Sequence, residues 1–303
     1  MKTVDVLDSH LAYTEAGTGD PVVLLHGNPT SSHIWRHVVP RLAGRARVIA
    51  PDLIGMGASG KPAIAYDYAD HAAYLEAFLD AVGADRPVLV GYDWGGSLAL
   101  DWAARHPDRI RGVSVMETFL RPMTWAEYPA GAVAFFRTLR TPGAGERMAL
   151  EENWFIETAL RATNGGISDA DLAVYRKPYP DPESRRPLLA WPRQIPLAEA
   201  GGEPFAPAAV ATRFEAYGAW LASSPEVPKQ LLTASPYGLG SPAMVEWARG
   251  HAAALEIRSI GEAVGHHAPE DAPEAIADAV LDLLDRVGAE DFDRALDDGA
   301  AAA

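Results

Sequence analysis

The chain has 303 residues, and at roughly 150 residues per domain this length predicts two domains, or one large unit with an insertion. Its 41 acidic and 26 basic residues leave a formal charge of −15, so nucleic acid and anionic membrane surfaces are not expected as partners. The absence of cysteine excludes disulfides, thiol nucleophiles and cysteine-based metal sites. Asp5 and Asp8 occupy the place of a secretory signal's apolar stretch, so a cytoplasmic protein is expected.

The first 119 residues alternate between strand and helix patterns. Between Val4 and Ala16, apolar and polar residues alternate, which predicts an antiparallel start with one buried face. Short apolar runs then predict fully buried parallel strands at Pro21–Leu25, Ala46–Ala50, Pro87–Val90 and Val113–Met116, with helices at Tyr68–Val82 and Gly96–His106. This order predicts an α/β fold in which helices flank a mostly parallel central sheet.

The pattern changes after Phe119. Residues 120–207 contain helical segments and many prolines but no convincing strand, so we expect an inserted helical cap. Strand patterns return at Lys229–Ala234 and Leu255–Ile260, so the core is predicted to combine 1–119 with 208–303. Residues 289–303 are acidic and alanine-rich with little to bury, and we expect them to be disordered.

The strongest local motif is Gly-Tyr-Asp-Trp-Gly-Gly at residues 91–96. It directly follows a predicted strand and opens a predicted helix, which is the context of a nucleophile elbow. Such a tight turn needs small residues around the nucleophile, and glycines stand at 91, 95 and 96. The central residue is Asp93, which predicts a carboxylate nucleophile, with a helix N-cap as the alternative role.

Several segments together resemble the haloalkane dehalogenases of the α/β-hydrolase superfamily. These are residues 24–36, 51–61, 91–96 and 265–271, continued within the cap at 121–129 and 153–160. The resemblance covers nearly the whole chain. It implies an α/β-hydrolase fold and hydrolysis of a haloalkane to an alcohol, a halide and a proton through a covalent alkyl ester on Asp93. The implied partners are a small apolar halogenated substrate, water and a halide ion, without cofactor or metal, in a monomer or weak homo-oligomer.

A leaving halide needs hydrogen-bond donors rather than an acid, because it departs as an anion. Trp94, whose indole N–H can only donate, follows the nucleophile, and Asn28 follows the strand Pro21–Leu25. Both stand where the family has its halide-binding pair, although Trp94 also fits simple core packing. Resemblance to the superfamily further implies that the backbone N–H groups of Asn28 and Trp94 form the oxyanion hole.

Hydrolysis of the ester requires a base, and nine histidines are available. His266 follows the last predicted strand and matches the family pattern, with His267 as the alternative; the family usually has an aromatic or apolar residue at the latter position. The acid that orients the base is assigned to Glu117, because segment 231–238 contains no acidic residue. Glu117 resembles the acid of one dehalogenase subgroup, and its alternative role is a surface glutamate at a strand end.

An apolar pocket is expected beneath the cap, lined by Phe136, Phe155, Pro192 and Ile195. These residues also fit packing within the cap alone. The glycine-rich segment 55–61 matches a nucleotide-binding pattern, but Pro62 replaces the required hydroxyl residue, so a surface loop is favoured.

Three competing functions share this fold. An epoxide hydrolase has the same aspartate elbow, but Asn28 and the missing acid on the penultimate strand disfavour it. A coelenterazine-type luciferase resembles dehalogenases closely and stays an alternative. A non-catalytic receptor is disfavoured by the intact set of Asp93, Glu117 and His266.

Overall fold

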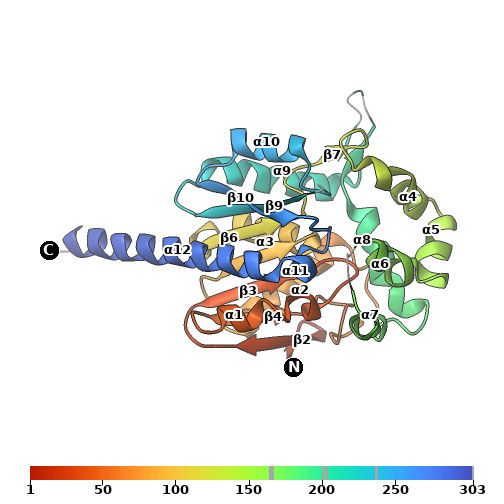
Figure 1. Cartoon of the computed structure of the whole chain (residues 1–303), viewed down its shortest axis with the longest axis horizontal. Helices are drawn as coiled ribbons and strands as arrows, with labels where there is room; N and C mark the ends of the chain where they lie inside the picture. Colours follow the sequence, from red (N-terminus) through yellow and green to blue (C-terminus); the bar gives the residue numbers. More distant parts are fainter. Residues whose placement is uncertain (164–166, 200, 202–203, 236–237, 302–303) are drawn as a thin grey trace.

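An eight-stranded sheet forms the centre of the molecule (Figure 1). The computed structural model describes residues 1–163, 167–199, 201, 204–235 and 238–301. The strand order is β1-β2-β4-β3-β5-β6-β9-β10; β2 runs antiparallel to both neighbours, and the remaining pairs are parallel. The strands are β1 (Lys2–Val6), β2 (Ser9–Ala16), β3 (Pro21–Leu25), β4 (Arg47–Pro51), β5 (Val88–Tyr92), β6 (Gly112–Met116), β9 (Lys229–Ser235) and β10 (Leu255–Glu262). The predicted α/β class and antiparallel start are confirmed.

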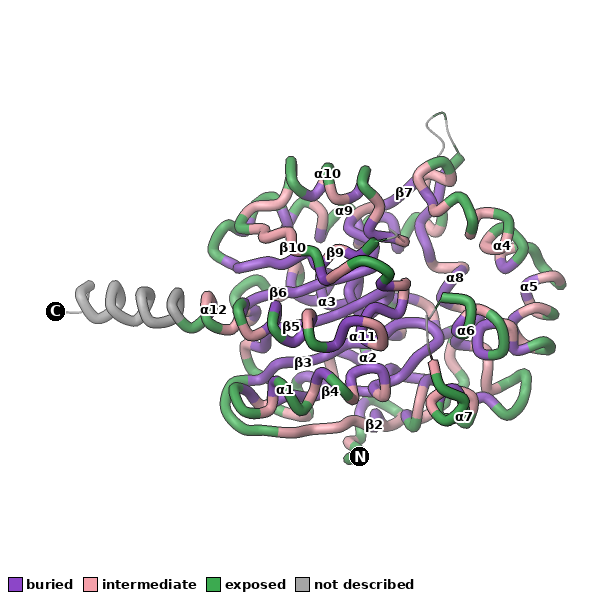
Figure 2. Tube along the Cα trace, viewed as in Figure 1, coloured by how far each residue is buried: buried purple, intermediate pink, exposed green. Residues whose placement is uncertain are grey.

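Helices cover the sheet on two sides. In Figure 1, α12 crosses in front of the strands, whereas α2 and α3 lie behind them. Strands β3, β5 and β6 are buried along their whole length (Figure 2), which explains their continuous apolar sequences. The covering helices are α1 (Val39–Leu42), α2 (Tyr68–Ala81), α3 (Trp94–Arg105), α9 (Ala208–Ser223), α10 (Pro242–His251), α11 (Ala268–Asp271) and α12 (Pro273–Ala301), with 3₁₀ turns η1 (Ser32–Trp35) and η2 (Pro107–Arg109).

The segment between β6 and β9 is mostly helical and lies to one side of the sheet (Figure 1). Its elements are α4 (Ala130–Arg140), α5 (Ala144–Glu146), α6 (Leu160–Thr163), α7 (Asp169–Arg176) and α8 (Arg186–Gln194), the π-helical turns η3 (Arg147–Glu151) and η4 (Phe155–Ala159), and the 3₁₀ turn η5 (Glu183–Arg185). The prediction that this segment has no strand is wrong, because β7 (Met123–Thr124) pairs in parallel with β8 (Leu197–Ala198). Strands of two residues are too short to produce a periodic sequence signal.

The C-terminal helix α12 reaches into the segment 289–303. Its packing against the core is described as far as Val287, which is buried, as are Ile276, Val280 and Leu283. The side chains beyond Gly288 and residues 302–303 lie outside the described part of the chain, so the disorder predicted for 289–303 stays a prediction.

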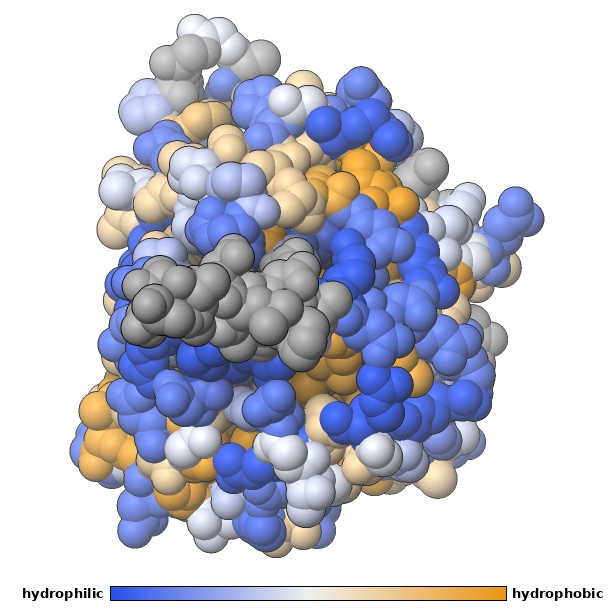
Figure 3. Space-filling view, turned by 90° about the vertical axis from the view of Figure 1, so that its left-hand side faces the viewer, coloured by the Kyte–Doolittle hydropathy of each residue, from blue (hydrophilic) through white to orange (hydrophobic). Residues whose placement is uncertain are grey.

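Hydrophilic residues predominate on the face turned toward the viewer in Figure 3, and apolar residues form separate patches there. None of the helices in the described ranges is both long enough and apolar enough to cross a membrane.

Candidate active site

Asp93 sits in the sharp turn between β5 and α3, as the elbow motif predicts. Its backbone has φ 51°, a left-handed conformation that is costly for a residue with a side chain. Its N–H donates to the carbonyls of Met116 and Glu117 at 3.3 and 3.1 Å, which ties the turn to the end of β6. The Asp93 side chain makes no capping hydrogen bond to the described first turn of α3, which argues against the N-cap role.

The three glycines of the motif stand where a side chain would collide with the backbone or a neighbouring residue. A Cβ atom on Gly91 would lie 2.4 Å from the carbonyl oxygen of Gly95, and one on Gly95 would lie 2.2 Å from that of Leu25. A Cβ atom on Gly96 would lie 2.7 Å from Thr118 Cβ. Strand, turn and helix therefore approach each other so closely that the elbow requires glycine at all three positions.

His266 lies between two carboxylates. Its Nε2 is 3.5 Å from Asp93 Oδ2, and its Nδ1 is 3.1 Å from Glu117 Oε2. The structure thus brings together the three side chains assigned from the sequence, from the ends of β5 and β6 and the loop after β10. Because Glu117 holds Nδ1, the other ring nitrogen faces the elbow, as a base acting there requires.

Glu117 is 3% exposed, which rules out the alternative role as a surface residue. Like Asp93 it has a positive φ, 45°. Its carboxylate accepts hydrogen bonds from the N–H groups of Gly238, Leu239 and Gly240 at 3.4, 3.0 and 3.3 Å. These donors follow the penultimate strand, so the loop after β9 contributes backbone donors to a carboxylate from β6.

The charge of His266 depends on its two neighbours. Burial lowers the pKa of His266, but hydrogen bonds and charge interactions with the carboxylates of Asp93 and Glu117 raise this pKa overall to about 10. With both carboxylates ionised, the imidazole is therefore protonated at neutral pH. Any reaction that neutralises Asp93 removes one of the two groups that raise this pKa.

Asn28 contacts the elbow through its backbone and helix α8 through its side chain. Its N–H donates to Asp93 Oδ1 at 2.7 Å, and its Nδ2 donates to the carbonyl oxygen of Leu188 in α8 at 3.2 Å. The amide nitrogen carries two N–H groups, so this contact occupies only one of them. Trp94 is 2% exposed, and its indole stacks on Trp191 with ring centroids 4.5 Å apart.

A cavity of about 240 Å³ lies above the elbow, between the carboxyl ends of the strands and segment 120–207. The residues assigned to halide binding, catalysis and the pocket line it, with the exception of Glu117: Asn28, Asp93, Trp94, Phe136, Phe155, Pro192, Ile195 and His266. The sequence did not single out Tyr128 and Leu239, which also line it. Phe135 and Trp154, whose ring centroids lie 3.6 Å apart, belong to the same lining.

His267 also lines the cavity, but it contacts neither carboxylate. Its Nδ1 lies 3.2 Å from the hydroxyl of Tyr92. Burial and the positive charge of His266 hold the pKa of His267 well below its usual value. The geometry therefore favours His266 over His267 as the base.

Comparison with known proteins shows the family to which the chain belongs. Residues 20–139 match the family model described as alpha/beta hydrolase fold. Haloalkane dehalogenases of Bradyrhizobium diazoefficiens and Sphingobium indicum are 45% and 39% identical to the chain, over 92% and 94% of it and 92% and 95% of their own lengths. The chain belongs to the haloalkane dehalogenase family.

Solved structures of that family superimpose closely on the fold. The haloalkane dehalogenase DbeA from Bradyrhizobium elkani matches with a TM-score of 0.88 and 42% identity, covering 95% of this chain and 98% of its own. The dehalogenase DatA from Agrobacterium tumefaciens matches with 0.87 and 36%, covering 94% and 97%. Within the described residues, no group of three or more histidine, aspartate or glutamate side chains is arranged to hold a metal ion.

Sequence reasoning missed the contacts made by backbone atoms. The donors to Glu117 and the Leu188 carbonyl that holds Asn28 carry no side-chain signal, because any residue supplies these groups. The cap residue Tyr128 lies in the stretch 121–129, which already resembles the family, so that stretch was the available signal for it.

Proposed function

We propose that this protein is a haloalkane dehalogenase that hydrolyses small apolar haloalkanes through an alkyl ester on Asp93. The observation that carries the proposal is the asymmetry of the Asp93 carboxylate. Its Oδ1 is held by the N–H of Asn28, and its Oδ2 faces His266 beside an apolar cavity. A carboxylate held in this way leaves Oδ2 as the candidate oxygen for attack on a saturated carbon.

In the first half-reaction, Oδ2 of Asp93 bonds to the carbon that carries the halogen, and the halide leaves with the electron pair of the carbon–halogen bond. The departing anion needs donors where its charge develops. The indole N–H of Trp94 and the second N–H of Asn28 Nδ2 are our candidates for these donors. The stack with Trp191 and the Leu188 hydrogen bond limit the movement of both side chains.

In the second half-reaction, water attacks Cγ of the ester and gives a proton to His266. Esterification has by then removed the negative charge of Asp93, so the pKa of His266 falls from its raised value and the neutral base becomes available. Oδ1 becomes an oxyanion, for which the N–H of Asn28 already lies at hydrogen-bond distance, and the N–H of Trp94 at the start of α3 is the second candidate donor. The bond from Cγ to Oδ2 then breaks, Oδ2 takes the proton from His266, and the alcohol leaves with Oδ2. The carboxyl group that forms again on Asp93 then loses the remaining water proton to the solvent.

The aromatic and apolar lining supports an apolar substrate and the exclusion of bulk water. We assign residues 120–207 as the cap that closes the cavity, since Phe136, Phe155, Pro192 and Ile195 reach it from this segment. The cytoplasmic location and the monomeric or weakly associating state expected from the sequence stay predictions.

The test separates the two half-reactions with 1-bromobutane. Wild-type protein should release bromide continuously, whereas His266→Phe should release one bromide per active site and then stop. Intact-protein mass spectrometry of that variant should show one added butyl group, and peptide mapping should place it on Asp93. His267→Phe provides the matched control, because it removes a neighbouring histidine and should continue to turn over.

Three outcomes would overturn this proposal. An adduct that accumulates only in His267→Phe would make His267 the base. Continuous bromide release by Asp93→Ala would remove the nucleophile. Hydrolysis of 1,2-epoxybutane without any bromide release from 1-bromobutane would favour an epoxide hydrolase instead.

A further inference from the structure

The peptide unit between Gly27 and Asn28 lies at the centre of a convergent set of hydrogen bonds. Its N–H donates to Asp93 Oδ1 at 2.7 Å. Its carbonyl oxygen accepts from the N–H of Thr30 at 3.0 Å and from the Thr30 hydroxyl at 3.1 Å, and it lies 2.9 Å from Nδ1 of His26. Hydrogen bonds accepted by a carbonyl polarise its peptide, and the N–H of the same unit becomes a stronger donor. This peptide is therefore polarised toward Asp93.

The Thr30 hydroxyl continues into a chain of buried side chains. Its Oγ1 lies 2.5 Å from the hydroxyl of Tyr92, which in turn lies 3.2 Å from Nδ1 of His267. Thr30, Tyr92 and His267 are 1%, 0% and 2% exposed. The chain therefore connects a cavity residue to the Gly27 carbonyl through the protein interior.

The number of protons available shows which group donates in each hydrogen bond between His267, Tyr92 and Thr30. A carbonyl can only accept, so Thr30 uses its single hydroxyl proton on Gly27. Tyr92 must then donate its own proton to Thr30, and the tyrosine oxygen accepts from Nδ1 of His267. This arrangement requires that His267 carries a proton on Nδ1.

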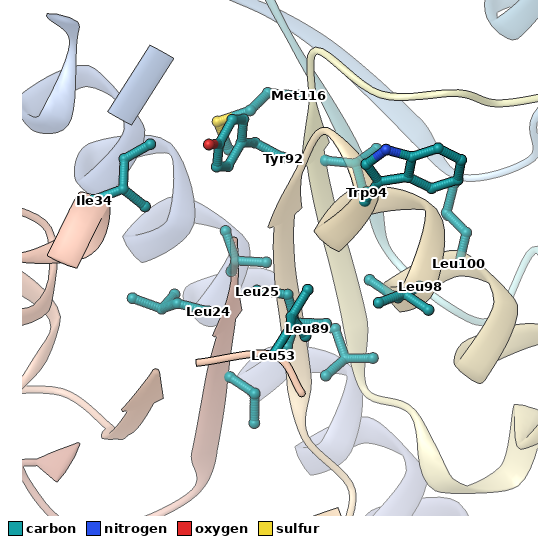
Figure 4. Packing of buried hydrophobic residues seen from close by; sticks show 14 of the residues in the cluster. Leu24, Leu25, Ile34, Leu53, Leu89, Tyr92, Trp94, Leu98, Leu100 and Met116 are labelled. Carbon is teal, nitrogen blue, oxygen red and sulfur yellow. The ribbon is translucent and has the colours of Figure 1, made fainter. Parts of the chain in front are cut away.

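Tyr92 acts from behind the elbow rather than from the cavity. Figure 4 shows Tyr92 and Trp94, the two neighbours of Asp93 in the chain, pointing away from each other. Trp94 and His267 line the cavity, whereas Tyr92 and Thr30 are not part of its lining. An effect of Tyr92 or Thr30 on the reaction must therefore pass through another group.

We infer that His267, Tyr92 and Thr30 are positioning residues that strengthen the Asn28 N–H as the oxyanion donor for ester hydrolysis. The inference rests on the proposed function. In the first half-reaction Oδ1 loses negative charge as Oδ2 forms its bond to carbon, so a stronger donor does not accelerate that step. In the second, water bonds to Cγ, its proton passes to His266, and the charge on Oδ1 increases. The hydrogen-bond chain from His267 to Thr30 should therefore accelerate hydrolysis of the ester but not its formation.

The experiment measures the two steps separately. Rapid-quench reactions of the whole protein with 1-bromobutane follow bromide release and the butyl adduct by intact mass. Thr30→Val keeps the shape of the side chain and removes its hydroxyl. It should slow ester hydrolysis by about tenfold, less than the roughly 10²–10³ for loss of a whole oxyanion donor. The bromide burst should keep its wild-type rate, and the adduct should accumulate before the steady state.

Further variants separate positioning from loss of stability. Thr30→Ser retains the hydroxyl and should restore hydrolysis, whereas Tyr92→Phe and His267→Phe should show progressively smaller accumulation of the adduct. Tyr74→Phe removes a tyrosine hydroxyl that bonds Asp8 and is not part of the cavity lining, and it should leave both steps unchanged. If Thr30→Val does not fold, Tyr92→Phe provides the same comparison.

The outcomes distinguish this inference from the proposed function. Absence of bromide release by the wild type would contradict the function itself. Wild-type turnover combined with equal slowing of both steps, or with unchanged hydrolysis in Thr30→Val and Tyr92→Phe, would overturn the positioning role.

Discussion

The two oxygens of Asp93 have different neighbours, and this difference sets the order of events at the site. One oxygen is bonded by a backbone N–H, and the other faces an imidazole that is protonated while both carboxylates are charged. Under the proposed mechanism, His266 changes from cation to base only after Asp93 has become an ester. The nucleophile thereby controls the protonation of the base.

Glu117→Gln tests this coupling through the pH dependence of turnover. In the alkyl-enzyme, Glu117 is the remaining carboxylate that raises the pKa of His266, and burial lowers that pKa. The variant should lower this pKa, so the acid limb of the kcat profile should move to lower pH. The maximal rate should also fall, by up to about 10⁴-fold as in hydrolases whose histidine loses its orienting acid.

The measurement is kcat for bromide release between pH 5 and 10, with circular dichroism to check the fold. Glu127→Gln is the matched control, because Glu127 pairs with Arg121 and neither residue is part of the cavity lining. An acid limb that moves to higher pH, or a fully active Glu117→Gln, would place the orienting acid elsewhere.

At the scale of elements, helix α8 contacts both candidate halide donors. Its Leu188 carbonyl accepts from Asn28, and its Trp191 lies in a stack between Trp94 and His71, at centroid distances of 4.5 and 3.9 Å. His71 is buried, and its burial lowers its pKa to about 3, so this ring is neutral in the stack. One helix of segment 120–207 therefore contacts two candidate donors from separate parts of the core, the loop after β3 and the start of α3.

We predict that Trp191→Phe weakens the binding of halide to the site. The smaller ring leaves space beside the Trp94 indole, so the donor is held less firmly. The inhibition constant for bromide should rise about three- to tenfold, equivalent to roughly 0.7–1.4 kcal/mol, and it is measured by product inhibition. Trp102→Phe, a buried tryptophan of α3 outside the cavity lining, should leave that constant unchanged. An equal effect of both variants would contradict a specific role for α8.

The elements differ in how well the sequence predicts them. The fully buried strands β3, β5 and β6 agree with the predicted ranges to within two residues, because strands buried on both faces have continuous apolar sequences. The sequence also allowed Asp93, Glu117 and His266 to be assigned as candidates, since each residue follows a strand at the same edge of the sheet. Strands β7 and β8 and the donors to Glu117 were not, because they depend on contacts between segments far apart in the sequence.

At the scale of the whole molecule, the packing of α12 predicts which part of the C-terminus is dispensable. Its buried side chains within the described residues end at Val287. Removal of residues 289–303 should leave turnover unchanged and Tm within about 2 °C of the full chain, because this truncation retains all the described core residues of α12. Truncation after Ala279 removes Val280, Leu283 and Val287 and should lower Tm by more than about 10 °C. Thermal unfolding of both truncated proteins measures these changes in Tm. A large decrease in Tm on removal of residues 289–303 alone would show that these residues pack on the core.

The strand order has a consequence for synthesis on the ribosome. Strand β6 pairs with β9, but about a hundred residues, including helices α4 to α9, lie between them in the chain. At roughly 5–20 residues per second, β6 is an unpaired apolar edge for on the order of ten seconds. A nascent chain at this stage already contains the nucleophile but not the base, and its exposed edge is the segment that we expect a chaperone to cover.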